Sequence, residues 1–198
     1  MLILPATNLL VQRALRRCWA FVLASAMLGG LGALPNAAGS DLVMTEPQVK
    51  ALCLLNFAKY ISWPAEAFAT TNAPIRIAIA GDERIHQELE RAAKNKVISG
   101  RPVLVLDYED GRVPENCHML FIGATQKSRT QEILKAVSEK PTITVGDADD
   151  FADRGGVIMF VKRENKVRFE VNLKAARAAQ LQISSRLLAL ADAVRGKE

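Results

Sequence analysis

Few side chains in this sequence could do acid–base, nucleophilic or metal chemistry. The 198 residues include two histidines, His86 and His118, and three cysteines, so a four-ligand zinc site is not expected. Ser184 and Ser185 could act with His118 as nucleophile and base. Serines are also common helix N-caps, and a lone histidine at the start of an apolar strand is more often structural. We therefore expect no catalytic residues, no metal and no cofactor.

Small and polar residues follow three apolar runs of the sequence, at residues 81–82, 123–125 and 146–147. In parallel sheets the carboxyl ends of the strands line the ligand crevice, so Asp82, Thr125 and Asp147 are candidate small-ligand residues. The alternative is that they are ordinary turn and cap residues. The acidic cluster that begins at Asp147 lacks the spacing of an EF-hand loop, which favours a solvated loop over a calcium site.

Arg168, Glu170 and Asn172 alternate along a predicted strand, so they share one face of it. On a buried face they would need mutual hydrogen bonds or a partner's charge. On an edge strand they would be solvated, and the spacing alone favours this second interpretation.

Residues 1–38 have the three parts of a cleavable signal peptide. A basic segment with Arg13, Arg16 and Arg17 precedes the apolar run 18–34, and small residues follow it. A permanent membrane anchor is the alternative, but glycines within the run and Pro35 favour cleavage. We expect an exported protein with a linker at 39–44 and no stable membrane insertion after cleavage.

The charge balance argues against nucleic acid as a partner. The net charge of +5 includes three arginines of the signal peptide, and without them 23 basic residues face 21 acidic ones. A near-neutral surface of mixed sign is not a nucleic-acid footprint. With 49% hydrophobic residues, the chain is also unlike a disordered protein.

Two cysteines, Cys53 and Cys117, remain after export. In an oxidising compartment they could form a disulfide. Alternatively, Cys53 is a small core residue of an apolar helix. The sequence leaves both possibilities open.

Strand and helix patterns alternate through most of residues 45–198, which predicts one three-layer α/β domain. Its parallel-rich sheet would carry helices on both faces and an antiparallel C-terminal hairpin over residues 157–171, at one edge. Apolar runs predict strands at 75–80, 103–106, 118–122 and 142–145, and 3.6-residue periodicity predicts helices at 83–94, 126–137, 173–179 and from Ser184 or Ser185 to about residue 194.

A further helix is predicted at residues 45–62, and it is apolar nearly all round. Such a helix is buried on most sides, by its own domain or by a partner. Asn56, Phe57 and Lys59 are therefore candidate residues of a homodimer or partner interface, with simple burial beneath the sheet as the alternative.

Several segments are recognisable together in order and spacing. They are 55–59 (LNFAK), 63–64 (WP), 117–122 (CHMLFI), 144–147 (TVGD), 151–152 (FA), 155–158 (GGVI), 168–173 (RFEVNL), 183–185 (ISS) and 187–188 (LL). Together they resemble the YfiR-like family of periplasmic proteins, formerly a domain of unknown function.

The resemblance implies a small exported α/β protein, often a dimer, that is not an enzyme. It implies repression of an inner-membrane diguanylate cyclase through that enzyme's periplasmic region, which lowers cyclic di-GMP and restrains biofilm formation. It also makes Gly155, Gly156, Arg168, Glu170 and Asn172 candidate family-defining residues, for folding or for binding.

Overall fold

The computed structural model describes residues 44–108 and 111–197. The predicted signal peptide and all of the linker except Met44 lie outside the described residues. Among the described residues, no helix combines the length and apolarity that crossing a bilayer requires.

An eight-stranded sheet forms the centre of the fold, with the strand order β10-β8-β7-β6-β5-β2-β4-β3. The strands are β2 (Ile75–Ala80), β3 (Val97–Ile98), β4 (Arg101–Asp107), β5 (Met119–Ile122), β6 (Ile143–Gly146), β7 (Ile158–Arg163), β8 (Lys166–Asn172) and β10 (Ala193–Arg195). The pairs β4–β2, β2–β5, β5–β6, β6–β7 and β8–β10 are parallel, whereas β7–β8 and β3–β4 are antiparallel. The predicted α/β class with a mostly parallel sheet is confirmed.

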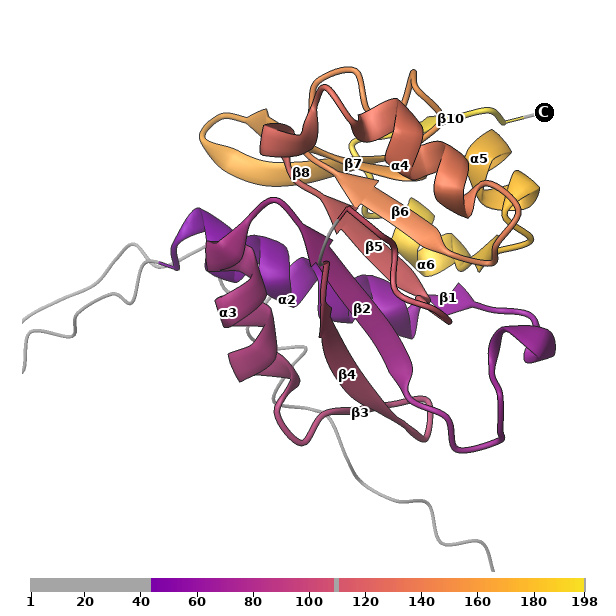
Figure 1. Ribbon diagram of the computed structural model, residues 1–198. Coiled ribbons are helices and arrows are strands. Elements are labelled where there is room, and N and C mark those ends of the chain that lie inside the picture. The colour runs from indigo at the N-terminus through magenta and orange to yellow at the C-terminus, as the bar shows by residue number, and fades with distance from the viewer. Residues whose placement is uncertain (1–43, 109–110, 198) are drawn as a thin grey trace, which may run out of the picture. The chain divides into compact units, whose positions relative to one another are not determined.

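Helices cover both faces of this sheet (Figure 1). They are α2 (Glu46–Lys59), α3 (Glu83–Ala93), α4 (Thr130–Val137), α5 (Leu173–Ala178) and α6 (Ser185–Leu188), with 3-10 turns at Ala65–Ala67 and Ala124–Gln126. Strands β1 (Ile61–Ser62) and β9 (Gln182–Ile183) form a separate antiparallel pair. It ties the segment after α2 to the segment after α5.

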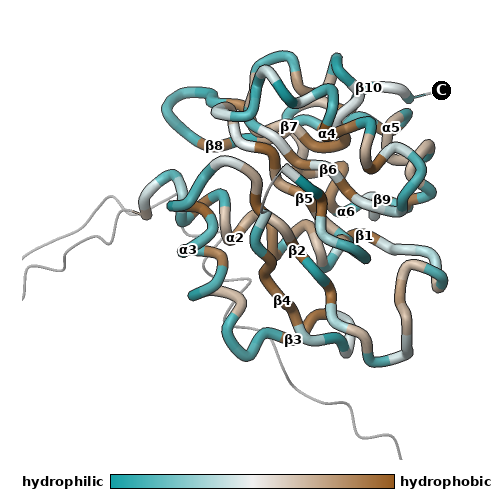
Figure 2. Tube along the Cα trace, viewed as in Figure 1, coloured by the Kyte–Doolittle hydropathy of each residue, from teal (hydrophilic) through white to brown (hydrophobic). Residues whose placement is uncertain are grey.

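The core consists of two clusters, one on each face of the sheet. Helices α2, α3, α5 and α6 contribute to the larger cluster, together with Ile77, Phe121 and Phe160 from the strands. The smaller cluster lies beneath α4 and includes Leu120 and Phe151. Figure 2 shows hydrophobic residues concentrated along the central strands β2, β5 and β6, as expected for strands that are buried on both faces.

The C-terminal region differs from the sequence prediction. Helix α6 ends at Leu188, and Ala193–Arg195 form β10 beside β8. The prediction of a helix to about residue 194 was therefore wrong beyond Leu188. Pairing of residues 193–195 with β8, which would otherwise be an open edge, outweighed the local helix propensity. As a result β8 is not an edge strand, and the antiparallel hairpin lies one strand inside the sheet.

Candidate functional site

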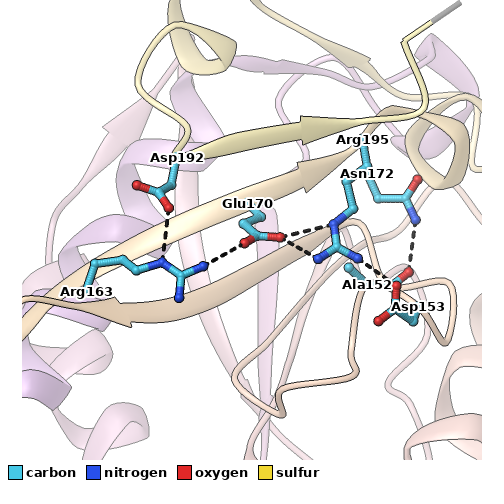
Figure 3. A network of polar contacts seen from close by, with 7 residues as sticks. All are labelled: Ala152, Asp153, Arg163, Glu170, Asn172, Asp192 and Arg195. Carbon is cyan, nitrogen blue, oxygen red and sulfur yellow. Dashed lines mark hydrogen bonds and ion pairs between the residues drawn. The ribbon is translucent and has the colours of Figure 1, made fainter.

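The buried carboxylate of Glu170 lies at the centre of an ionic network (Figure 3). The side chain is 7% exposed and lies between two guanidinium groups. Arg195 on β10 donates from Nε and Nη2 to Oε2 at 3.1 and 2.8 Å. Arg163 on β7 donates from Nη2 to Oε1 at 3.4 Å. The predicted solvated edge was wrong for Glu170, because β10 covers that side of β8.

Two further carboxylates complete this network. Asp192 accepts from Nε of Arg163 at 3.3 Å, and Asp153 accepts from Nη1 of Arg195 at 2.6 Å. Three carboxylates thus surround two guanidinium groups, and their contacts link β7, β8, β10 and the loop that follows β6. Hydrogen bonding to Glu170 is the main reason that the pKa of Arg195 is raised. The sequence analysis missed both arginines, and no local pattern marks them.

Asn172 and the glycine pair shape the neighbouring loop. Asn172 Oδ1 caps α5 by accepting from the N–H of Ala175 at 3.1 Å, and its Nδ2 donates to the carbonyl of Ala152 at 3.1 Å. Gly156 lies against the ring of Phe151, so a Cβ there would clash with it. Gly155 has a φ of +97°, which favours glycine. The contacts of these residues account for a structural role.

A second charged cluster joins the start of α2 to the end of β6. Lys50 Nζ lies 2.7 Å from Asp147 Oδ2 and 2.8 Å from Glu46 Oε1. Burial by itself would lower the pKa of the Lys50 ammonium, but hydrogen bonds with Asp147 and Glu46 outweigh it, so the pKa is raised. The hydrogen bond from Lys50 lowers the pKa of Glu46. Asp147 Oδ1 is buried without a hydrogen-bond partner among the described residues.

The Lys50–Asp147 pair borders two cavities. One, of about 380 Å³, extends to Arg163, Glu170 and Arg195 and so connects both charged clusters. The other, of about 290 Å³, brings together the three predicted strand ends, Asp82, Thr125 and Asp147.

The remaining predicted binding residues lie elsewhere. Gly155 and Asn172 line a separate groove of about 520 Å³ between α4 and α5. Arg168 is exposed on β8. Of the predicted set, Asp147 and Glu170 thus share one cavity, and Gly155 and Asn172 share another. The sequence analysis did not identify Lys50, which lies between the two cavities. The only mark of Lys50 in the sequence is a single charge near the start of an apolar helix.

His118 has a structural role, and the serine–histidine alternative gains no support. Its Nδ1 accepts from the N–H of Arg76 at 3.1 Å, and its Nε2 lies 3.0 Å from the carbonyl oxygen of Ala67. The ring stacks on Phe68 at 4.3 Å between centroids, and burial lowers its pKa. Ser184 Oγ accepts from the N–H of Arg186 and caps α6. Both ring nitrogens of His118 and the hydroxyl of Ser184 are thus hydrogen-bonded to backbone groups.

The possible disulfide is not formed, since Cys53 and Cys117 are both free thiols. Cys53 packs into the core cluster on the α2 side of the sheet, and Cys117 belongs to the cluster on the α4 side. The sheet therefore stands between them. Burial raises the pKa of Cys53 to about 11 and that of Cys117 to about 12.

Helix α2 is buried on one side and exposed on the other. Phe57 is 2% exposed and packs on Phe160 and Phe169, with ring centroids 5.7 and 4.9 Å apart, so it is a core residue and not an interface residue. Asn56 and Lys59 are exposed and bond each other at 3.0 Å. Together with Leu52, which is 40% exposed, they form a surface that we call the α2 stripe.

Comparison with solved structures supports the fold alone. A conserved domain protein from Vibrio cholerae O1 biovar El Tor has a TM-score of 0.54 at 11% identity, and the similar region covers 77% of this chain and 61% of the other. The chain thus spans about three fifths of that relative's length. An ABC domain in complex with L-Trp from Streptococcus pneumoniae has a TM-score of 0.43 at 12% identity, over 62% of this chain and 55% of the other.

No protein with a curated function matches the chain significantly. A family model described as YfiR/HmsC-like matches residues 47–192, from the first turn of α2 to the residue before β10. Because this match spans most of the chain, the protein belongs to the YfiR/HmsC-like family, whose members are periplasmic regulators of diguanylate cyclase signalling rather than enzymes.

Proposed function

We propose that this chain is an exported regulatory binding protein, without enzymatic activity, that represses a membrane diguanylate cyclase. It would bind the periplasmic region of that enzyme and so lower cyclic di-GMP and biofilm formation. The observation that carries the proposal is the family match over residues 47–192. Deletion of the gene is expected to raise cellular cyclic di-GMP. An unchanged level of cyclic di-GMP, together with no cyclase recovered by crosslinking in the periplasm, would refute the proposal.

The α2 stripe is the surface we propose for the cyclase. It borders a groove of about 600 Å³ between α2 and α3, which Met44, Gln48, Leu52 and Ala92 help to line. Met44 and Leu52 are 45% and 40% exposed, so a partner could cover apolar area here without unfolding the core. Polar Asn56 and Lys59 would set the register of the contact.

Binding of the purified protein to the cyclase's periplasmic region tests this surface. Leu52→Glu places a charge in the stripe and is expected to weaken binding about tenfold or more, since burying an unpaired charge is costly. Lys135→Glu, on the exposed face of α4, is the matched control and should bind as the unchanged protein does. Equal affinities for all three proteins would remove the α2 stripe from the proposal and leave the regulation itself standing.

Export by cleavage after residue 38 or 39 belongs to the same proposal. The protein recovered from the periplasmic fraction is expected to begin at Gly39 or Ser40 when its N-terminus is sequenced. Recovery of the intact chain in the membrane fraction would instead support a permanent anchor.

A second candidate function is a periplasmic sensor or carrier of a small ligand. It is favoured by the 290 Å³ cavity at the strand ends, where the buried Asp147 Oδ1 has no hydrogen-bond donor within residues 44–108 and 111–197. A ligand that donates a hydrogen bond there should raise the melting temperature of the protein, because it binds only the native state. The same ligand should have no effect on Asp147→Asn. A panel of amino acids, nucleotides and polyamines that produces no shift would count against this candidate.

A further inference from the structure

The groove between α4 and α5 takes no part in either proposed function. Its volume of about 520 Å³ lies within the range of small-molecule sites. Residues of β6 and of the loop between β6 and β7 line it between the two helices (Figure 1). It shares no lining residue with the cavity at the strand ends or with the groove beside the α2 stripe. A ligand bound here would therefore occupy a separate site.

The walls of this groove are apolar and made partly of small side chains. Leu134 and Val137 line it from α4, and Ala175, Ala178 and Ala179 line it from the segment that contains α5. The short side chains on the α5 side leave space that larger residues would fill. Burial of apolar surface is the main favourable term in binding of this kind, so these walls favour a ligand with a hydrocarbon body.

Two side-chain donors adjoin Val157 in the same groove. Thr144 is 3% exposed, and its Oγ1 accepts from the N–H of Val157 at 3.1 Å. Its own hydroxyl proton makes no hydrogen bond to the described residues. Asn172 Nδ2 uses one of its two protons for the carbonyl of Ala152 (Figure 3), and the N–H of Asn172 donates to the carbonyl of Val157 at 2.8 Å. The remaining protons favour a ligand that carries a hydrogen-bond acceptor.

The charges around the groove favour an anion over a cation. Lys174 lines it from the first turn of α5, is exposed, and forms no ion pair within residues 44–108 and 111–197. Asp153 is the only acidic side chain among the described lining residues, and Arg195 already pairs with it at 2.6 Å. An anionic group near the two donors would therefore meet an unpaired ammonium, whereas a cation would meet no unpaired carboxylate.

We infer that this groove binds a carboxylate with an unbranched hydrocarbon chain, which is the chemistry of a medium-chain fatty acid. The carboxylate accepts hydrogen bonds from Thr144 Oγ1 and Asn172 Nδ2 and is attracted by the charge of Lys174. The chain lies between Leu134 of α4 and Ala178 of α5. The polar end fixes the orientation of the ligand, and the apolar walls supply most of the affinity.

Isothermal titration calorimetry with decanoate tests this site. Decanoate should bind at least about tenfold more tightly than decylammonium, which has the same chain and the opposite charge. Octanoate should bind about 3- to 15-fold more weakly, because complete burial of one CH₂ lowers the dissociation constant about fourfold. Lys174→Glu should raise the dissociation constant at least about fivefold, since repulsion replaces attraction, and Lys174→Arg should restore binding. Lys166→Glu, at the exposed start of β8, is the control and should bind as the unchanged protein does.

Filling the groove is a second test that does not depend on charge. Ala178→Phe changes an exposed residue of α5 and should weaken decanoate binding at least about tenfold at an unchanged melting temperature. Ala189→Phe, at the exposed residue just after α6, is the matched control and should leave binding unchanged. In NMR spectra, decanoate should shift the amide signals of Gly155 and Ala175, which line the groove.

Several results would overturn the inference. They are no binding at up to about 1 mM decanoate, equal binding of decylammonium, and NMR shifts confined to the groove between α2 and α3. Unchanged affinity in both Lys174→Glu and Ala178→Phe would overturn it as well. A protein that binds decanoate in the expected way but binds no cyclase refutes only the proposed regulation, because the α2 stripe lies outside this groove.

Discussion

The network around Glu170 makes a quantitative prediction about stability. Arg195→Met keeps much of the aliphatic stem but removes three hydrogen bonds, two to Glu170 and one to Asp153. Removing one partner of a fully buried ion pair costs about 3–5 kcal/mol. Arg195 is 41% exposed and Arg163 stays near the carboxylate, so solvent reduces this cost. We expect the free energy of unfolding to fall by about 2 kcal/mol.

A double-mutant cycle separates the ion pair from simple packing. Glu170→Gln keeps the shape of the side chain and should cost about 1 kcal/mol. In the double variant no buried carboxylate is left without its partner. The double variant should therefore lose about 2 kcal/mol of unfolding free energy, which is less than the sum of the two single losses. The difference is a coupling energy of about 1 kcal/mol.

Urea unfolding followed by circular dichroism measures all three variants. The expected loss for Arg195→Met corresponds to a fall of about 4–8 °C in melting temperature for a domain of this size. Arg186→Met, an exposed arginine on α6, is the control and should change stability by less than about 0.5 kcal/mol. A loss below about 0.5 kcal/mol for Arg195→Met, or strictly additive effects, would refute the reasoning.

Three further predictions test the structural interpretation of other candidate residues. Gly156→Ala should cost about 1–3 kcal/mol because its Cβ meets the Phe151 ring, and Phe151→Leu should offset part of that loss in urea unfolding. The pKa of His118 is lowered, so the unfolded state binds more protons than the native state near pH 6. The free energy of unfolding should therefore fall as pH drops below about 6.5. In a pH series, His118→Gln should lack this His118-dependent loss of stability. Cys53 and Cys117 should react with a thiol reagent at pH 8 only after unfolding, and a reductant should leave the melting temperature unchanged; prompt labelling of the native protein would contradict this.

Secondary structure was largely predictable from local pattern. The apolar run 75–80 is β2 with the same bounds, and Asp82 caps α3 by accepting from the N–H groups of Arg84 and Ile85. The helix predicted from residue 126 begins only at Thr130, because a 3-10 turn at Ala124–Gln126 precedes it. Strand runs and caps are visible in sequence because their physical causes lie within a few residues.

The candidate site was predictable only in part. Asp147 was found because it follows an apolar strand, but its partner Lys50 lies 97 positions away in the chain. Phe57 was taken as an interface candidate because an apolar helix does not reveal which face meets the core. The exposed Asn56 and Lys59 remain candidates of the proposed partner surface.

The sequence by itself determined the α/β class, most of the strands and the family, because hydrophobic periodicity and the order of short motifs are local properties. Only the tertiary structure decided that Glu170 is buried, since its burial depends on β10 reaching β8 from more than twenty residues away. It also decided that Cys53 and Cys117 stay apart, on opposite sides of the sheet. Both outcomes depend on which distant segments pack together, and no local pattern encodes that pairing.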